Sequence, residues 1–252
     1  MNMKPLQMPL LEGIHLEKAS DNYTAKDKFC QHYQAMIGSL IYLMISSRPN
    51  IAWSVTCLSQ YMQNPTQQHV NACKHIFCYL RGMFNAWITY DGGKNSSLIG
   101  YSDTDWGENR DNWQSMTSYI FLMANTAIIW ASWMQKTMAQ SSTEAKYMAL
   151  SEACLEIAWL TTLQKKIGYE SNGLVPLVAN NQGGIFLAVN STHDCQLKHV
   201  NTCYHFICEY VEEGRVNIIY VTIDKMIADT LTKPLGTMKF ESFRSQLGIT
   251  TG

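Results

Sequence analysis

The sequence predicts an α/β protein with a mixed sheet and flanking helices, preceded by a small α-helical segment. Two observations carry this prediction. From Cys30 to the low eighties, apolar residues recur at helical spacing, whereas from residue 98 onward short strand-like runs alternate with turn signals and helices. A chain of 252 residues with 46% hydrophobic residues can also bury a substantial core.

The first 97 residues divide into two parts. Residues 1–29 show little periodicity and hold two of the six prolines, so we expect an extended leader that lies against another part of the molecule. Residues 30–95 predict three helices, in HYQAMIGSLIYLMIS, IAWSVTCLSQYMQN and QQHVNACKHIFCYLRGMF. The Met and aromatic residues between 35 and 62 are expected to form helix core rather than a platform for base stacking. The turn-rich YDGGKNSS at residues 90–97 marks the domain boundary.

Residues 98–252 are predicted to form a second domain. Three strands, SLIGYSDTDW, MTSYIFLMA and TAIIWASW, form an antiparallel meander. A long helix runs from Ser142 to about Ile167, with Ser142 or Thr143 as its N-cap and Glu144 in its first turn. Beyond it we expect a strand in VPLVA, helices in NNQGGIFLAVN and LKHVNTCYHFICEYVEEG, a strand in VNIIYVT and a last helical segment in MIADTLTKPL.

Composition limits the classes of function. The formal net charge is -1, which gives no overall electrostatic signal for nucleic acid. The charge is uneven, since residues 1–97 carry 8 Lys and Arg against 5 Asp and Glu, and the remainder carries 11 against 15.

The eight cysteines form no CxxC pair, so we expect reduced thiols and neither a zinc site nor disulfides. With no signal peptide and no apolar run of membrane-spanning length, an intracellular location, cytoplasmic or nuclear, is expected.

Five blocks in the second domain, GYSDTDW, SSTEAKYMALSEA, ANNQGGIFLA, KHVNTCYHFI and IADTLTKPL, resemble the C-terminal blocks of copia-type retrotransposon Pol polyproteins. The preceding IGSLIYLMISSRPNIAWSVTCLSQYMQNPTQQHVNACKHIFCYLRG resembles the segment before those blocks. The resemblance implies that residues 98–252 form a ribonuclease H-like domain and residues 30–95 the thumb or connection helices that end a reverse transcriptase. The implied ancestral function is cleavage of the RNA strand of RNA/DNA hybrids. The hybrid and the polymerase domain, whose YxDD strand does not occur in this sequence, are the implied partners.

The resemblance also implies four carboxylates around two Mg²⁺ ions, which activate a water and stabilise the leaving oxygen. The first falls on Asp103 and the fourth on Asp229, and both are retained. The second, a glutamate in the family, is Lys146 here, and the third, an aspartate, is Asn180. Asp105 lies two positions beyond Asp103 and is expected to face the same way.

These substitutions predict that metal-dependent cleavage is lost or very weak. We expect Lys146 to repel Mg²⁺ and to pair with Asp103 or Asp229 in its place, so that Mg²⁺ binding is weak or absent. Glu144 is no substitute, because two positions along a helix are about 200° apart. Taken alone, Lys146 would be an ordinary exposed helix lysine and Asp229 an ordinary carboxylate at a helix end.

Other departures from the family pattern include Trp113 and Gln114 in place of a basic pair, and Cys203 and Cys208 in place of arginines. Single G-to-A or C-to-T transitions produce such changes, which suggests a decayed genomic copy. The lost cations predict weak binding of a hybrid. Two classes of function stay open: a catalytically impaired ribonuclease H, and a non-catalytic fold, decayed or repurposed to bind nucleic acid or protein.

Overall fold

The computed structural model describes residues 4–92, 97–107, 111, 113–169, 174–190 and 203–251, apart from the side chains of residues 203–205. The start of the helix predicted in LKHVNTCYHFICEYVEEG lies outside the described residues, as does part of the boundary YDGGKNSS.

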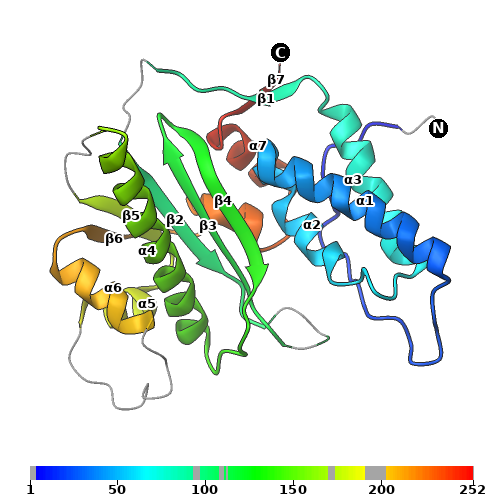
Figure 1. The fold of residues 1–252 in the computed structure, drawn as a ribbon, viewed down its shortest axis with the longest axis horizontal. Helices are drawn as coiled ribbons and strands as arrows, with labels where there is room; N and C mark the ends of the chain where they lie inside the picture. Colours follow the sequence, from blue (N-terminus) through cyan, green and yellow to red (C-terminus); the bar gives the residue numbers. More distant parts are fainter. Residues whose placement is uncertain are drawn as a thin grey trace.

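A five-stranded mixed sheet lies at the centre of the fold (Figure 1). Its order is β4-β3-β2-β5-β6. The antiparallel meander consists of β2 (Ile99–Thr104), β3 (Met116–Met123) and β4 (Thr126–Met134), and β5 (Val175–Ala179) and β6 (Val216–Tyr220) extend it in parallel. The predicted α/β class with a mixed sheet and flanking helices is confirmed.

Helices α4 (Ser142–Lys166), α5 (Gln182–Val189) and α6 (Cys203–Glu212) cover one face of the sheet (Figure 1). Phe121 of β3 and Leu177 of β5 point to this face and are fully buried in the same apolar cluster as the buried side of α4. Because side chains alternate along a strand, the neighbours of Phe121 point to the opposite face.

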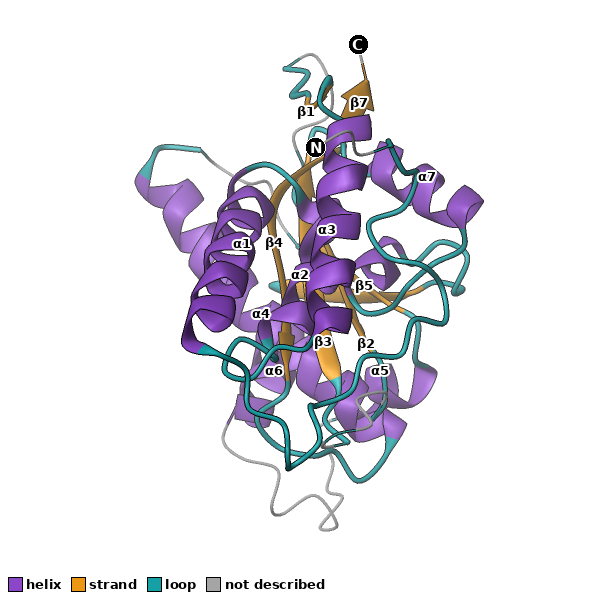
Figure 2. Cartoon of the chain, turned by 90° about the vertical axis from the view of Figure 1, so that its right-hand side faces the viewer, coloured by secondary structure: helices purple, strands orange, loops and turns teal. Residues whose placement is uncertain are grey.

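The opposite face is covered by the helices of the N-terminal part, as the turned view in Figure 2 shows. These are α1 (Asp27–Ser46), the short η1 (Pro49–Ile51), α2 (Ala52–Ser59) and α3 (Gln67–Gly82). Their buried side chains share one apolar cluster with the sheet residues Ile120, Leu122 and Val178. The helical segment and the sheet therefore pack around a common core.

Four elements near the C-terminus and the domain boundary correct the sequence prediction. The expected helical segment MIADTLTKPL is a 3₁₀ turn, η3 (Ile227–Leu231), and an unpredicted helix, α7 (Thr237–Gln246), follows it. An unpredicted strand pair joins β1 (Ala86–Ile88) to β7 (Ile249–Thr251) in antiparallel register. Strands of three residues are too short to show a period-two pattern, and their partners lie far apart in the chain.

The N-cap of α4 is Ser141, not Ser142 or Thr143. The Ser141 hydroxyl accepts the backbone N–H of Glu144 at 3.1 Å, and the Glu144 carboxylate accepts the backbone N–H of Gln140 at 2.6 Å. These two bonds satisfy backbone donors that no carbonyl of the helix can reach, and the helix itself begins at Ser142, as predicted.

The leader lies along α3 and contains no helix or strand in residues 4–26. Side chains of α3 hold its backbone: Gln68 donates to the carbonyl of His15 at 2.6 Å, and Nε2 of His75 donates to the carbonyl of Met8 at 3.1 Å. These contacts fix the position of residues 8–16, which form one wall of a cavity described below.

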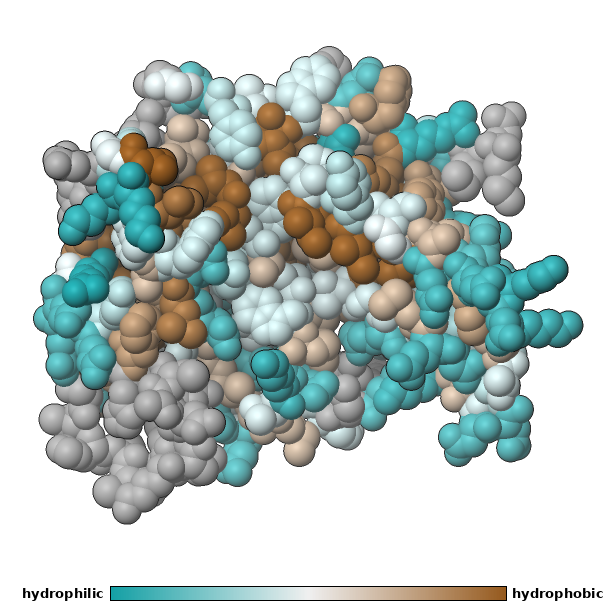
Figure 3. Space-filling model, in the orientation of Figure 1, coloured by the Kyte–Doolittle hydropathy of each residue, from teal (hydrophilic) through white to brown (hydrophobic). Residues whose placement is uncertain are grey.

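The outer surface carries apolar side chains on both helical layers. Figure 3 shows hydrophobic residues over α4 and over α1, where Leu163 and Ile45 are among the exposed ones.

No described helix is both long enough and apolar enough to cross a membrane. The cysteines whose side chains the structure describes are free thiols.

Candidate active site

The fold brings the four positions identified in the sequence to one edge of the sheet. Asp103 lies in β2, and Asn180 directly follows β5, which pairs with β2 in parallel. Lys146 lies near the start of α4, and Asp229 lies in η3, which packs against β2 and β3. Adjacent parallel strands end at the same edge, so Asp103 and Asn180 are neighbours although 77 residues separate them in the sequence.

Lys146 connects two of the other three positions. Its Nζ donates to Oδ1 of Asp103 at 2.5 Å and to Oδ1 of Asn180 at 2.8 Å. The Lys146 side chain is 18% exposed and that of Asp103 is 1% exposed. Of the two carboxylates considered from the sequence, Lys146 therefore pairs with Asp103.

Asp103 is held in its ionised form. Burial alone would raise the pKa of its carboxyl, but the charge and hydrogen bond of Lys146, together with the charge of Lys233, hold that pKa below its ordinary value. The second oxygen, Oδ2, accepts a hydrogen bond from Oγ1 of Thr232 at 2.8 Å. Both oxygens of this buried carboxylate are thus engaged by the protein.

Asp229 is also buried, and it lies between two lysines. Nζ of Lys233 is 2.9 Å from Oδ1, and Nζ of Lys239 donates to Oδ2 at 2.8 Å. Burial raises the pKa of Asp229, the charge of Asp103 raises it further, and the two lysines offset the increase only in part. The surroundings therefore lower the pKa of Asp103 and raise the pKa of Asp229.

The ion-paired cluster has a positive formal charge. It contains two carboxylates, of Asp103 and Asp229, and three ammonium groups, of Lys146, Lys233 and Lys239. Mg²⁺ prefers oxygen ligands, whereas an ammonium group can only donate hydrogen bonds. Within the part of the chain that the structure describes, no group of three or more His, Cys, Asp and Glu residues could hold a metal ion.

Sequence reasoning missed three residues of this cluster, Thr232, Lys233 and Lys239. Lys233 lies four residues after Asp229, a spacing that brings side chains together on a helical turn, so its role could have been inferred. Lys239 lies on α7, and no motif or spacing in the sequence relates it to Asp229.

Asp105 lies just beyond the end of β2, and its Oδ1 accepts the backbone N–H of Met116 at 2.6 Å. The other candidate carboxylate, that of Glu144, is turned to the backbone of Gln140. The structure therefore gives each of these carboxylates a backbone amide as a partner.

No protein-family model matches the chain. Its sequence is 36% identical over 218 residues to the "Retrovirus-related Pol polyprotein from transposon RE1" of Arabidopsis thaliana, a match that covers 86% of this chain and 15% of that protein. It is 34% identical over 251 residues to the "Retrovirus-related Pol polyprotein from transposon TNT 1-94" of Nicotiana tabacum, covering 98% of this chain and 19% of that protein. The chain thus spans less than a fifth of the length of these relatives.

One similar solved structure is that of LC11-RNase H1 in complex with an RNA/DNA hybrid. It is 16% identical, with a TM-score of 0.41, over 54% of this chain and 94% of that chain.

Proposed function

This chain belongs to the copia-type retrotransposon Pol polyproteins, and we propose that it carries a ribonuclease H-like domain that binds RNA/DNA hybrids weakly and does not cleave them. We assign the domain to residues 98–252, the thumb or connection helices of a reverse transcriptase to residues 30–95 and a leader to residues 1–29. An intracellular location and a polymerase domain as partner belong to the same proposal.

The observation that carries the proposal is the pair of hydrogen bonds from Lys146 to Asp103 and Asn180. In a two-metal site, these positions would supply oxygen ligands and negative charge to the ions. Here their side-chain oxygens accept from an ammonium group instead. The residues present therefore do not fit a bound Mg²⁺.

The size of the electrostatic effect supports this conclusion. At 4 Å and an effective dielectric constant of 20, two unit charges interact by about 4 kcal/mol, so an ammonium group and a divalent ion repel each other by roughly twice that amount. One retained carboxylate, Asp103, is already neutralised by Lys146, and the other, Asp229, faces two lysines. Between the two classes of function left open by the sequence, this arrangement favours the non-catalytic fold.

Binding of a hybrid should not depend on a divalent metal. Fluorescence anisotropy with a labelled RNA/DNA hybrid is expected to give the same dissociation constant in EDTA and in Mg²⁺ at matched ionic strength. The affinity should fall as salt rises, because phosphate contacts supply most non-specific binding. A hybrid that binds more tightly in Mg²⁺ than in EDTA would instead indicate a functional metal centre.

A further inference from the structure

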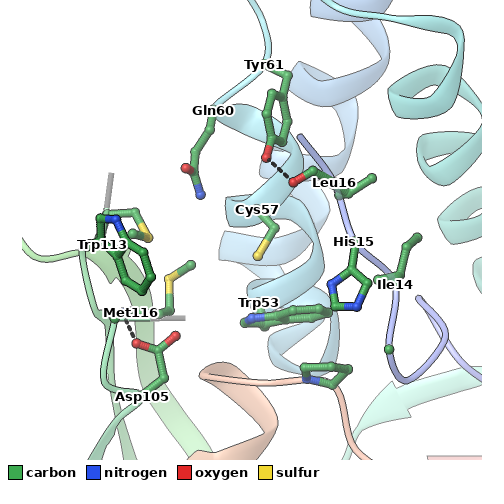
Figure 4. Close-up of a pocket in the computed structure, with 14 residues that line it drawn as sticks. Ile14, His15, Leu16, Trp53, Cys57, Gln60, Tyr61, Asp105, Trp113 and Met116 are labelled. Atoms are coloured by element: carbon green, nitrogen blue, oxygen red, sulfur yellow. Dashed lines mark hydrogen bonds between the residues drawn. The ribbon is translucent and has the colours of Figure 1, made fainter. Parts of the chain in front are cut away.

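A cavity of about 760 Å³ lies between the leader, α2 and the strand ends near Asp105 (Figure 4). Its volume falls within the roughly 300–1,000 Å³ that small-molecule sites occupy. The described residues that line it include three large aromatic side chains, Trp53, Tyr61 and Trp113. Its polar lining includes Asp105 and Gln60, and no lysine or arginine is among these lining residues.

Two tryptophans border the cavity on opposite sides in Figure 4. Trp53 extends from α2, which also presents Cys57 to the cavity, and it packs in part against the apolar core.

Trp113, on the other side, is 64% exposed and has a backbone φ of 57°. A bulky residue rarely adopts this left-handed conformation, and residues held in it cluster at ligand sites.

The wall opposite Asp105 is fixed in place by the protein itself. The ring of Tyr61 stacks on that of His69 with centroids 3.9 Å apart, and its hydroxyl donates to the carbonyl of Leu16 at 3.0 Å. These contacts tie the turn after α2 to α3 and to the leader, and leave the cavity largely preformed. A preformed site loses little free energy to ordering when a ligand enters it.

Asp105 is the one carboxylate among the described residues that line the cavity. The backbone N–H of Met116 holds one of its oxygens, and Figure 4 shows the carboxylate beside the Met116 side chain, on the side of the cavity that also carries Trp113. An ionised carboxylate can accept about four hydrogen bonds, so it can accept donors from a ligand in addition to its partners in the protein. Its negative charge disfavours a phosphate at this point of the cavity.

We propose that this cavity binds a guanine base, stacked against Trp53 and Trp113, with Asp105 accepting hydrogen bonds from its N1–H and 2-amino groups. Guanine presents two adjacent donors on one edge, which match the two oxygens of a carboxylate, whereas uracil presents a single N–H between two acceptors. The ribose and phosphate would remain at the open side of the cavity. The base could belong to a free guanine nucleotide or to an unpaired guanosine of a nucleic-acid strand.

Isothermal titration of the full chain with GMP and with UMP tests the proposal. GMP is expected to bind saturably and more tightly than UMP. Trp113→Gly should weaken the binding of GMP by about 5- to 150-fold, the usual effect of removing one stacking ring. Glycine suits the left-handed backbone at this position. Asp105→Asn should weaken the binding of GMP by about 10- to 100-fold, while the amide oxygen of the new side chain can still accept the N–H of Met116.

Trp106→Ala is the matched control, since Trp106 is 57% exposed but is not among the residues that line the cavity. It should leave GMP affinity unchanged, and circular dichroism should show the same fold for all variants. A single-stranded RNA with one guanosine, compared with the same strand carrying uridine there, separates the two sources of the base. Absence of saturable GMP binding, or GMP affinity unaffected by Trp113→Gly and Asp105→Asn, would overturn the proposal.

Binding of tetramethylammonium but not GMP would also overturn the proposal, by assigning the aromatic walls to a cation. The GMP measurement needs no hybrid and no metal, so its failure leaves the proposed loss of cleavage untouched.

Discussion

Lys146→Met is expected to lower the free energy of unfolding by about 3–5 kcal/mol at neutral pH, because it leaves the buried carboxylate of Asp103 without its main counter-charge. Asp103 is 1% exposed, so water cannot take over the role of the ammonium group. Methionine is close to lysine in size, which limits the contribution of lost packing. Urea denaturation with linear extrapolation measures the change.

Two further variants isolate the ion pair. Lys165→Met removes an exposed lysine from the same helix and should change the free energy of unfolding by less than about 0.5 kcal/mol. Adding Asp103→Asn to Lys146→Met removes both charges and should recover much of the lost stability. If Lys146→Met costs no more than Lys165→Met, the pair contributes nothing and the assigned charge state of Asp103 is wrong.

The cost of Lys146→Met should shrink in acid. The folded pKa of Asp103 lies below its unfolded value, so this group stabilises the natural chain above the unfolded pKa, and that contribution is lost as pH falls through the folded pKa. In the variant, Asp103 keeps its burial but loses the charge and hydrogen bond of Lys146, which raises its pKa, so acid protonates the carboxyl more readily and relieves the penalty.

The second large effect is expected from the double substitution Lys146→Glu and Asn180→Asp. With Asp103 and Asp229 retained, it restores four carboxylates at one edge of the sheet, which repel one another in the absence of a metal. This variant should therefore be less stable than the natural chain in EDTA and should gain stability in Mg²⁺, by about 2.7 kcal/mol at a hundred times the dissociation constant. Thermal unfolding at matched ionic strength measures both changes.

The natural chain is the control for this experiment, and Mg²⁺ should leave its unfolding temperature unchanged. Asn180→Asp alone keeps the ammonium group of Lys146 in place, so Mg²⁺ should change the unfolding temperature of this variant only slightly. An equal Mg²⁺ response in all three proteins would show that the ion binds elsewhere, and that Lys146 does not decide whether a metal binds.

The elements whose hydrophobic pattern extends over many residues could be predicted from the sequence. The three N-terminal helices and the meander show hydrophobic patterns over many residues, and such patterns survive tertiary packing. The strands β1 and β7 could not be predicted, because three residues carry no period and each pairs with a segment about 160 residues away. The 3₁₀ turn of η3 was predicted as a longer helical segment because its first residues fit either type of turn.

Some residues of the candidate site could be predicted from the sequence, and others could not. The family resemblance indicated Asp103, Lys146, Asn180 and Asp229, and the structure places Lys146 against Asp103 and Asn180. Lys239 was missed because its contact with Asp229 depends on how α7 folds back, which no local pattern encodes. The roles of these residues in chemistry stay predictions.

Cleavage of an RNA/DNA hybrid by the natural chain tests the central claim most directly. With a labelled RNA strand and either Mg²⁺ or Mn²⁺, we predict no cleavage by the natural chain above the level of its Asp103→Asn variant, because the ammonium group of Lys146 and the amide of Asn180 stand where metal-binding carboxylates are needed. Metal-dependent cleavage by the natural chain that disappears in Asp103→Asn would contradict this account.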